Sequence, residues 1–217
     1  MLNNIKAAIF DLDGTLVDSM GIWEKIDIEF LKERGLQVPS DLRDHIEHLS
    51  FIDTAKYFKD RFNLNETVEE IMAEWNNMAN YEYSNTITLK PGAKEYLNCL
   101  KAKGIKLALA TSNSHPLLEA VLKNNGVFEY FDSITTTIEV DKGKNHPDIY
   151  LLSAKKMNVS PDNCIVFEDI YPAVLGAKAA GMTVAAIYDI YSEHQKEDII
   201  KTADYFIYEY KELIEAC

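Results

Sequence analysis

Two carboxylates stand one residue apart near the start of the chain, directly after a run of apolar residues. Residues 7–10 are typical of a buried strand, and Asp11 and Asp13 follow it, before a glycine turn and the hydroxyl of Thr15. At the carboxyl end of a buried strand, both carboxylates can face the crevice in which open α/β sheets bind ligands. One carboxylate can attack phosphorus while the other transfers a proton. The pattern therefore predicts covalent phosphoryl chemistry on a bound magnesium ion.

Two other structures use a similar run of residues. Asp-x-Asp-Gly begins the calcium loop of an EF-hand, but that loop follows a helix and needs a Glu at its twelfth position, where this chain has Ile22. A purely structural turn after a strand also uses Asp, Gly and Thr for local hydrogen bonds. The choice between a structural turn and a reactive site depends on polar residues elsewhere in the chain.

Polar residues also follow three later predicted strands. In order along the chain, the four polar groups are Asp11 and Asp13, Thr111-Ser112-Asn113, Lys142-Gly143-Lys144, and Glu168-Asp169. The carboxyl ends of parallel strands lie side by side at one edge of a sheet. We therefore expect these groups to converge on one site, although they are far apart in the sequence.

Each group meets a separate need of phosphoryl transfer. Magnesium prefers oxygen ligands, so Asp11 and Asp169 are the expected metal ligands, with Glu168 as a further ligand or as an acid beside the site. Lys144 supplies a cation for the phosphate and for Asp11, and the Thr111 hydroxyl donates a hydrogen bond to a transferring oxygen. Taken alone, Thr111 also suits the end of a β-branched strand, and Lys144 also suits a solvated loop. Lys142 is the alternative candidate for the role given to Lys144. Their occurrence together, in order at strand ends, favours the reactive site.

Short apolar runs alternate with helical patterns along most of the chain. That alternation predicts parallel strands joined by right-handed helical crossovers. Pro91-Gly92 begins one predicted helix, His115-Pro116 begins another, and Pro147 and Pro172 mark two later helix starts. We therefore expect an α/β fold with a doubly wound, mostly parallel sheet. The expected strands are residues 7–10, 106–110, 133–136, 163–167, 183–187 and, with a weaker pattern, 205–207.

The segment from about residue 20 to residue 85 breaks this alternation. It has helical periodicity and no strand pattern, so we expect an α-helical bundle inserted after the first strand. Residues 1–16 and 87–217 would then form a Rossmann-like catalytic core, and residues 17–86 a helical cap domain. Residues 16–89 hold 7 basic and 15 acidic residues, and therefore 8 of the 13 excess negative charges. We interpret this charge as the solvated exterior of the bundle.

The composition indicates a globular protein without an anionic macromolecular partner. The chain has 217 residues, of which 47% are hydrophobic, and a formal net charge of -13 at pH 7. Nucleic-acid and anionic-membrane surfaces need clustered Lys and Arg, which are not found here. Cys99, Cys164 and Cys217 lie far apart, and no run approaches the roughly 20 apolar residues of a membrane helix. We expect a monomer of the reducing cytoplasm without a disulfide scaffold and without nucleic-acid or membrane partners.

Four stretches of the sequence resemble the motifs of one protein family. The chain is similar to the haloacid dehalogenase-like hydrolases, near the branch that holds β-phosphoglucomutases and small phosphatases with a helical cap. The resemblance covers nearly the whole chain. The stretches that carry it are Asp11–Ser19, Leu109–Ser112, Gly143-Lys144 with Pro147–Tyr150, and Val166–Asp169 leading to Ala179–Met182.

The resemblance implies a reaction through an aspartyl-phosphate intermediate. Asp11 corresponds to the family's nucleophile, and Asp13 to the residue that protonates the leaving alcohol and then activates water. The backbone carbonyl of Asp13 would join the carboxylates of Asp11, Asp169 and Glu168 around Mg²⁺. The dehalogenase branch lacks the second acidic residue of the first motif, so Asp13 argues for a phosphate substrate. We expect a Mg²⁺-dependent phosphatase whose partner is a small phosphorylated metabolite, a sugar phosphate or similar.

The predicted cap departs from that of the sugar-phosphate mutases. Those enzymes carry a histidine on the first cap helix and an arginine-containing loop that grips a second phosphate, whereas this chain has Trp23 and residues 45–51 at the corresponding positions. The missing arginine argues against a β-phosphoglucomutase-type activity, which stays an alternative together with a non-catalytic phosphate-binding module. The expected substrate contacts are Thr111, Ser112, Asn113 and Lys144 in the core and Trp23 and His48 in the cap, with His45 and Phe51 as further candidates.

Overall fold

A parallel sheet of six strands forms the centre of the molecule. The computed structural model describes residue 2 and residues 4–214. The strands are β1 Ala7–Phe10, β2 Lys106–Thr111, β3 Ser133–Thr136, β4 Cys164–Glu168, β5 Thr183–Ile187 and β6 Tyr205–Ile207. Their order is β3-β2-β1-β4-β5-β6, and every neighbouring pair is parallel. All six expected strands are confirmed, with β2 extended to Thr111 and β4 running to Glu168.

The strand order reverses at β1, and this reversal fixes where a ligand can bind. From β1 the chain passes outward through β2 and β3, and it then returns to β4 on the other side of β1. Phe10, the last residue of β1, is level with Leu109 of β2 and Phe167 of β4. The residues after these three strands therefore emerge side by side at a topological switch point, where doubly wound sheets bind their ligands.

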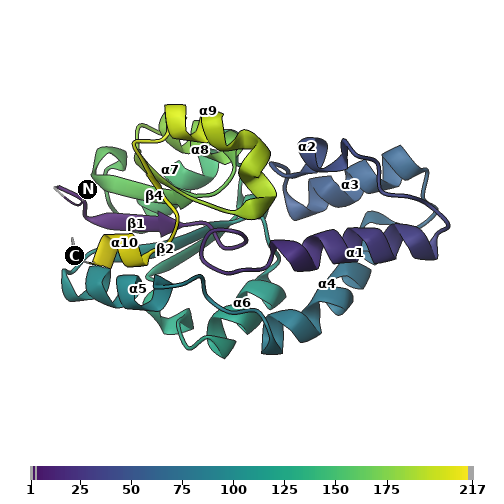
Figure 1. Cartoon of the computed structure of the whole chain (residues 1–217), viewed down its shortest axis with the longest axis horizontal. Coiled ribbons are helices and arrows are strands. Elements are labelled where there is room, and N and C mark those ends of the chain that lie inside the picture. The colour runs from purple at the N-terminus through teal and green to yellow at the C-terminus, as the bar shows by residue number, and fades with distance from the viewer. Residues whose placement is uncertain (1, 3, 215–217) are drawn as a thin grey trace.

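Helices cover both faces of the sheet. They are α5 Ala93–Ala102, α6 His115–Asn124, α7 Asp148–Lys156, α8 Tyr171–Ala179, α9 Lys196–Thr202 and α10 Lys211–Ile214. Because alternate strand residues point to opposite faces, Ala8 and Phe10 pack in one hydrophobic cluster with α5, α6 and α10, and Ala7 and Ile9 in another with α7, α8 and α9. In Figure 1 these two sets of helices lie below and above the sheet. The doubly wound prediction is confirmed.

Four further helices, which we call the helical insert (residues 20–85), separate β1 from α5 in the sequence. They are α1 Met20–Glu33, α2 Leu42–Ile46, α3 Phe51–Phe62 and α4 Val68–Asn85, and they project from one end of the sheet (Figure 1). Thr67 begins α4 with a capping box. The rings of Phe30, Phe58 and Trp75 pack edge to face at centroid distances from 4.9 to 6.0 Å. The expected helical insertion is confirmed, while the domain bounds stay a prediction.

The cysteines give a mixed result for the expected compartment. Cys164 is a free thiol buried in β4. Cys99 of α5 is disulfide-bonded, and Cys217 lies outside the described residues. Disulfides persist in oxidising compartments, so the bonded Cys99 does not support the expected reducing compartment. None of the helices in the described residues has the length and hydropathy needed to cross a membrane. The cytoplasmic location and the monomeric state stay predictions.

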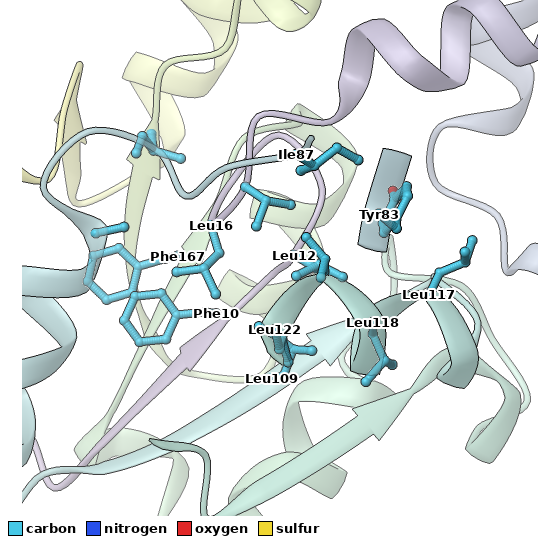
Figure 2. Close-up of a cluster of buried hydrophobic side chains, with 14 of the residues drawn as sticks. Phe10, Leu12, Leu16, Tyr83, Ile87, Leu109, Leu117, Leu118, Leu122 and Phe167 are labelled. Atoms are coloured by element: carbon cyan, nitrogen blue, oxygen red, sulfur yellow. The ribbon is translucent and has the colours of Figure 1, made fainter. Parts of the chain in front are cut away.

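The aromatic pair at the centre of the sheet generates a test of the fold. Phe10 and Phe167 lie side by side in Figure 2, and their rings stack with a centroid distance of 4.5 Å and an interplanar angle of 5°. Both are fully buried. We expect Phe167→Ala to lower the free energy of unfolding by about 3–5 kcal/mol, measured by urea denaturation, because it removes buried apolar surface and leaves a cavity. Ile200→Ala, at a half-exposed position of α9, should change it by about 0.5 kcal/mol or less. Equal effects of the two substitutions would contradict this description of the core.

Candidate active site

Three carboxylates meet where β1 and β4 end. Asp11 directly follows β1, Glu168 is the last residue of β4, and Asp169 comes next. One carboxylate oxygen from each residue lies within 4.8 Å of the other two, and all three side chains are buried. The parallel register of β1 and β4 brings these residues together, as the sequence predicted.

Lys144 provides the positive charge beside this cluster. Its ammonium group donates a hydrogen bond of 2.5 Å to Asp11 Oδ1 and forms an ion pair with Glu168 Oε1. Lys144 is 3% exposed, whereas Lys142, its competitor in the sequence, lies exposed to solvent. The structure therefore identifies Lys144 as the lysine that faces the carboxylates.

Two glycines allow the loop that carries Lys144 to lie close to its neighbours. A Cβ atom on Gly176 of α8 would lie 2.0 Å from the carbonyl oxygen of Lys144. A Cβ atom on Gly143 would lie 2.3 Å from the carbonyl oxygen of His48 in the helical insert, and the same oxygen accepts a hydrogen bond of 3.2 Å from the Lys144 backbone N–H. The loop is therefore fixed between α8 and the insert.

Burial dominates the electrostatics of the carboxylate cluster. Burial, with added contributions from the nearby Asp11 and Asp189, raises the pKa of Asp169 to about 7. Burial also raises the pKa of Glu168 to about 8, against the opposing effect of Lys144. Burial lowers the pKa of Lys144, but the negative charges of Asp11 and Glu168 together outweigh burial and raise that pKa overall. Three buried carboxylates with one ammonium group leave an excess of negative charge.

The cluster suits a divalent cation with oxygen ligands. Asp169 Oδ2 and Glu168 Oε2 are buried and have no hydrogen-bond partner among the described residues. The other Asp169 oxygen accepts a hydrogen bond of 2.9 Å from Thr15 Oγ1, which fixes the carboxylate. Gly14 adopts φ +79°, and a Cβ atom there would lie 2.3 Å from Asp169 Oδ2. Unsatisfied carboxylate oxygens and excess negative charge fit a divalent cation that prefers oxygen ligands.

Asp13 has different surroundings, although it is only two residues from Asp11. Its carboxylate accepts hydrogen bonds from Ser19 Oγ at 2.6 Å, from Asn113 Nδ2 at 2.7 Å and from the hydroxyl of Tyr83. The indole N–H of Trp23 donates to the Tyr83 oxygen at 2.7 Å and lies 3.4 Å from Asp13 Oδ1. Asp13 is therefore held by Ser19 just before the insert, by Tyr83 of the insert and by Asn113 after β2, and its side chain is not part of the three-carboxylate cluster. Its expected backbone contact to the metal stays a prediction.

The last residue of β2 and the two residues after it supply hydroxyl and amide groups to the cavity that Asp11 lines. Thr111 is 1% exposed, and its hydroxyl oxygen accepts a hydrogen bond of 3.0 Å from the Asn113 backbone N–H. Ser112 Oγ is buried and has no hydrogen-bond partner in the described part of the chain. All three residues line the same cavity as Asp11. The hydroxyl groups of Thr111 and Ser112 can donate to an anion in that cavity, whereas the side-chain amide of Asn113 already donates to Asp13 and Tyr83. The role of the three residues as substrate contacts stays a prediction.

A cavity of about 470 Å³ lies between the strand ends and helices α1, α2 and α3. Asp11, Asp13 and Lys144 line one side of it, and Trp23 and Phe51 of the insert line another. His48 and His45 are absent from the described lining. His48 meets the core through its backbone, and burial lowers the pKa of its imidazole; the structure gives its side chain no place in the cavity, and its role as a substrate contact stays a prediction.

Sequence reasoning missed several residues that face this site. Tyr83, near the end of α4, is fully buried, and burial and the neighbouring Asp13 raise its pKa well above the usual value. Arg43 and Glu47 line the cavity from α2 and the residue after it. The spacing of Arg43 and Glu47 could have indicated that they lie together, because residues four apart on a helix share a face. No local pattern identifies Tyr83, since its contact with Asp13 spans 70 residues.

Comparison with known families agrees with this geometry. A sequence model of the family described as haloacid dehalogenase-like hydrolase matches residues 5–181. The chain belongs to the haloacid dehalogenase-like hydrolases. Hexitol phosphatase A of Escherichia coli (strain K12) is 34% identical to it over 184 residues, which cover 84% of this chain and 82% of that protein. Phosphorylated carbohydrates phosphatase of Thermotoga maritima is 31% identical over 180 residues, which cover 82% of each.

Solved structures share the fold of this haloacid dehalogenase-like hydrolase. CbbY from Rhodobacter sphaeroides, in complex with phosphate, superposes with a TM-score of 0.85 at 24% identity and covers 96% of both chains. The β-phosphoglucomutase of Clostridium difficile superposes with a TM-score of 0.81 at 24% identity, covering 96% of this chain and 93% of that one. At this identity the likeness establishes the fold.

The raised pKa values generate a stability prediction. Unfolded Asp and Glu titrate near pH 4, whereas burial raises the pKa of Asp169 to about 7 and that of Glu168 to about 8. Between about pH 4 and about pH 8 the folded state binds more protons than the unfolded state. The free energy of unfolding therefore falls as the pH rises through this range. In the presence of a chelator we expect the melting temperature to fall from about pH 5.5 to about pH 8.

Asp169→Asn tests the source of this pH dependence. It removes one titrating carboxylate and keeps the oxygen that accepts from Thr15. Its melting temperature should fall less over the same pH range than that of the unmodified protein. Mg²⁺ should raise the melting temperature of the unmodified protein more than that of the variant. Identical pH slopes in the two proteins would show that Asp169 does not titrate in this range.

Proposed function

We propose that this hydrolase is a Mg²⁺-dependent phosphatase that removes phosphate from a small organic phosphate monoester, a sugar phosphate or similar. The observation that carries the proposal is the arrangement of Asp11 and Asp13. Asp11 is hydrogen-bonded to Lys144 within the buried carboxylate cluster. Asp13 lines the same cavity but is held by other hydrogen-bond partners, including Asn113. The names of the two related phosphatases support a substrate of this class.

In the first step, the Asp11 carboxylate attacks phosphorus, and the bond between phosphorus and the alcohol oxygen breaks. Asp13 donates a proton to the departing alcohol oxygen, so that a neutral alcohol leaves. Lys144 holds Asp11 in position and offsets the repulsion between its charge and that of the phosphate. The product of this step is an acyl phosphate on Asp11, the aspartyl-phosphate.

In the second step, water attacks the phosphorus atom and releases inorganic phosphate, which restores the Asp11 carboxylate. Asp13 accepts the proton of the attacking water, which returns it to the form needed for the next cycle. Thr111 and Ser112 bind the phosphate oxygens from the end of β2. Mg²⁺ held by Asp11, Glu168 and Asp169 would supply charge that stabilises the transferring phosphoryl group.

The helical insert would act as a cap that excludes bulk water from this reaction. It meets the core through His48, whose carbonyl oxygen accepts from the Lys144 N–H, and through Glu47, which accepts a hydrogen bond of 2.6 Å from Gln195. A closed site strengthens electrostatic interactions and protects the aspartyl-phosphate until a single water attacks. We propose residues 17–86 as this cap and residues 1–16 and 87–217 as the catalytic core.

The nucleophile assignment has a direct test. The purified protein with Mg²⁺ should hydrolyse p-nitrophenyl phosphate, and Asp11→Asn should lower kcat at least about 10³-fold because an amide does not form the covalent intermediate. Lys144→Ala should also lower kcat, whereas Lys142→Ala, at an exposed position two residues away, should leave it unchanged. Melting curves identify any variant that fails to fold. Persistent turnover by folded Asp11→Asn would refute the assignment.

Tyr83→Phe tests whether the hydroxyl of Tyr83 positions Asp13 as a proton donor. An alkyl alcohol leaves poorly without protonation, whereas p-nitrophenolate leaves well without it. We therefore expect kcat/KM, which reports departure of the alcohol, to fall about 10-fold for an alkyl phosphate and much less for p-nitrophenyl phosphate. A merely structural effect would lower both values by the same factor, and that result would contradict the positioning role.

A further inference from the structure

The insert side of the cavity carries charged groups that the two reaction steps do not use. Glu24 and Asp27 of α1 line the cavity, and so do Arg43 of α2 and Glu47 directly after it. Asp11 and the other reacting groups line the same cavity from the strand ends. A substrate with its phosphate at Asp11 would therefore place its alcohol portion toward these four residues.

Two of these residues have polar atoms that lack partners. The Nε and Nη2 atoms of Arg43 are buried and have no hydrogen-bond partner among the described residues. Glu47 uses one carboxylate oxygen to accept from Gln195, and its other oxygen, Oε2, is buried without a partner in the same set of residues. Buried donors and acceptors are normally satisfied, and an unsatisfied one destabilises the fold unless a ligand or water meets it.

The charges around Arg43 determine which ligand groups can bind to its guanidinium group. The positive charge of Arg43 acts on the carboxylates of Asp27 and Glu47, and Glu24 lies close enough to Asp27 to add negative charge there. Burial raises the pKa of Asp27 to about 7, Arg43 opposes that shift, and Glu24 adds to it. Burial likewise raises the pKa of Glu47, against the hydrogen bond from Gln195 and the charge of Arg43. A second anionic group on a substrate would be attracted by Arg43 but repelled by its surroundings.

A hydroxyl group has both the acceptor and the donor that these unsatisfied atoms lack. It accepts a hydrogen bond from the guanidinium group of Arg43 and donates one to the carboxylate of Glu47, whereas a carboxylate or phosphate only accepts and an ammonium group only donates. Trp23 and Phe51 form an apolar surface on the same cavity, with ring centroids 6.0 Å apart. Such a surface suits the C–H groups of a carbon chain whose hydroxyls point toward Arg43.

We propose that Arg43 and Glu47, with Asp27 beside them, form a subsite that binds the hydroxyl groups of a neutral polyhydroxylated alcohol and disfavours a second negative charge. The inference rests on the proposed phosphatase function, because it takes the alcohol portion of the phosphate monoester as the ligand. It assigns to α1 and α2 the selection of the leaving alcohol. The chemistry at phosphorus stays with the strand ends.

Glucitol 6-phosphate and gluconate 6-phosphate provide a matched pair of ligands. They have the same carbon chain, and the terminal CH₂OH of the first is a carboxylate in the second. We expect kcat/KM to be at least about 10-fold higher for glucitol 6-phosphate. In calorimetry with the Asp11→Asn protein and Mg²⁺, we expect glucitol 6-phosphate to bind tighter by a similar factor. A bisphosphate, fructose 1,6-bisphosphate, should be a poor substrate.

Substitutions of Arg43 and Glu47 test whether these residues cause the preference for glucitol 6-phosphate. Arg43→Gln should lower the ratio of kcat/KM for glucitol 6-phosphate to kcat/KM for p-nitrophenyl phosphate at least about 10-fold. Glu47→Gln removes a negative charge and should narrow the preference for glucitol 6-phosphate over gluconate 6-phosphate. Arg61→Gln is the control, because Arg61 lies on α3, pairs with Asp41 and is not among the cavity residues; both ratios should stay unchanged.

The outcomes separate this inference from the proposed function. Absence of turnover for p-nitrophenyl phosphate and every other monoester would overturn the proposed function, and the calorimetric comparison would still decide the ligand preference. Turnover with equal or better use of gluconate 6-phosphate or the bisphosphate would overturn the subsite alone. An unchanged ratio in folded Arg43→Gln would have the same meaning.

Discussion

The site depends on the burial of three carboxylates around a single ammonium group. Asp11, Glu168 and Asp169 each lose hydration when the sheet forms, and Lys144 offsets only part of that cost. The surrounding structure serves this arrangement: Tyr150 donates a hydrogen bond of 2.8 Å to Glu168, Thr15 donates to Asp169, and glycines leave room for close backbone approach. The charge that remains uncompensated is what makes the site suitable for a divalent cation.

The two acids of the first motif differ because of their neighbours. Asp11 faces the carboxylate cluster and Lys144, whereas Asp13 accepts hydrogen bonds from neutral groups, including Ser19, Tyr83 and Asn113. In the reaction that we propose, the nucleophile needs a fixed position and a shielded charge, and the proton-transfer group needs access to the departing oxygen and then to water. Spacing of two residues allows both, because the turn after β1 directs the two side chains into different surroundings.

The core of the site was predictable because parallel register translates sequence position into spatial position. Residues at the ends of β1, β2 and β4 must meet once the strands are recognised, so Asp11, Thr111 and Asp169 could be placed without coordinates. The insert offered no such rule. Its helices were recognisable from their periodicity, but which side chains face the cavity depends on how the helices pack against the sheet. For that reason the sequence pattern does not show that Arg43 lines the cavity while His48 is absent from its described lining.

The same division separates the chemistry from the choice of substrate. The strand ends are fixed by backbone hydrogen bonds to neighbouring strands, and a change there alters the reacting groups themselves. The insert meets the core through side-chain and backbone hydrogen bonds, such as those of Glu47 with Gln195 and of His48 with Lys144, and it has its own aromatic core. Substitutions on α1 and α2 can therefore change the shape and charge of the cavity without disturbing Asp11 or Lys144. Such an arrangement allows one reaction at phosphorus to be combined with different leaving alcohols.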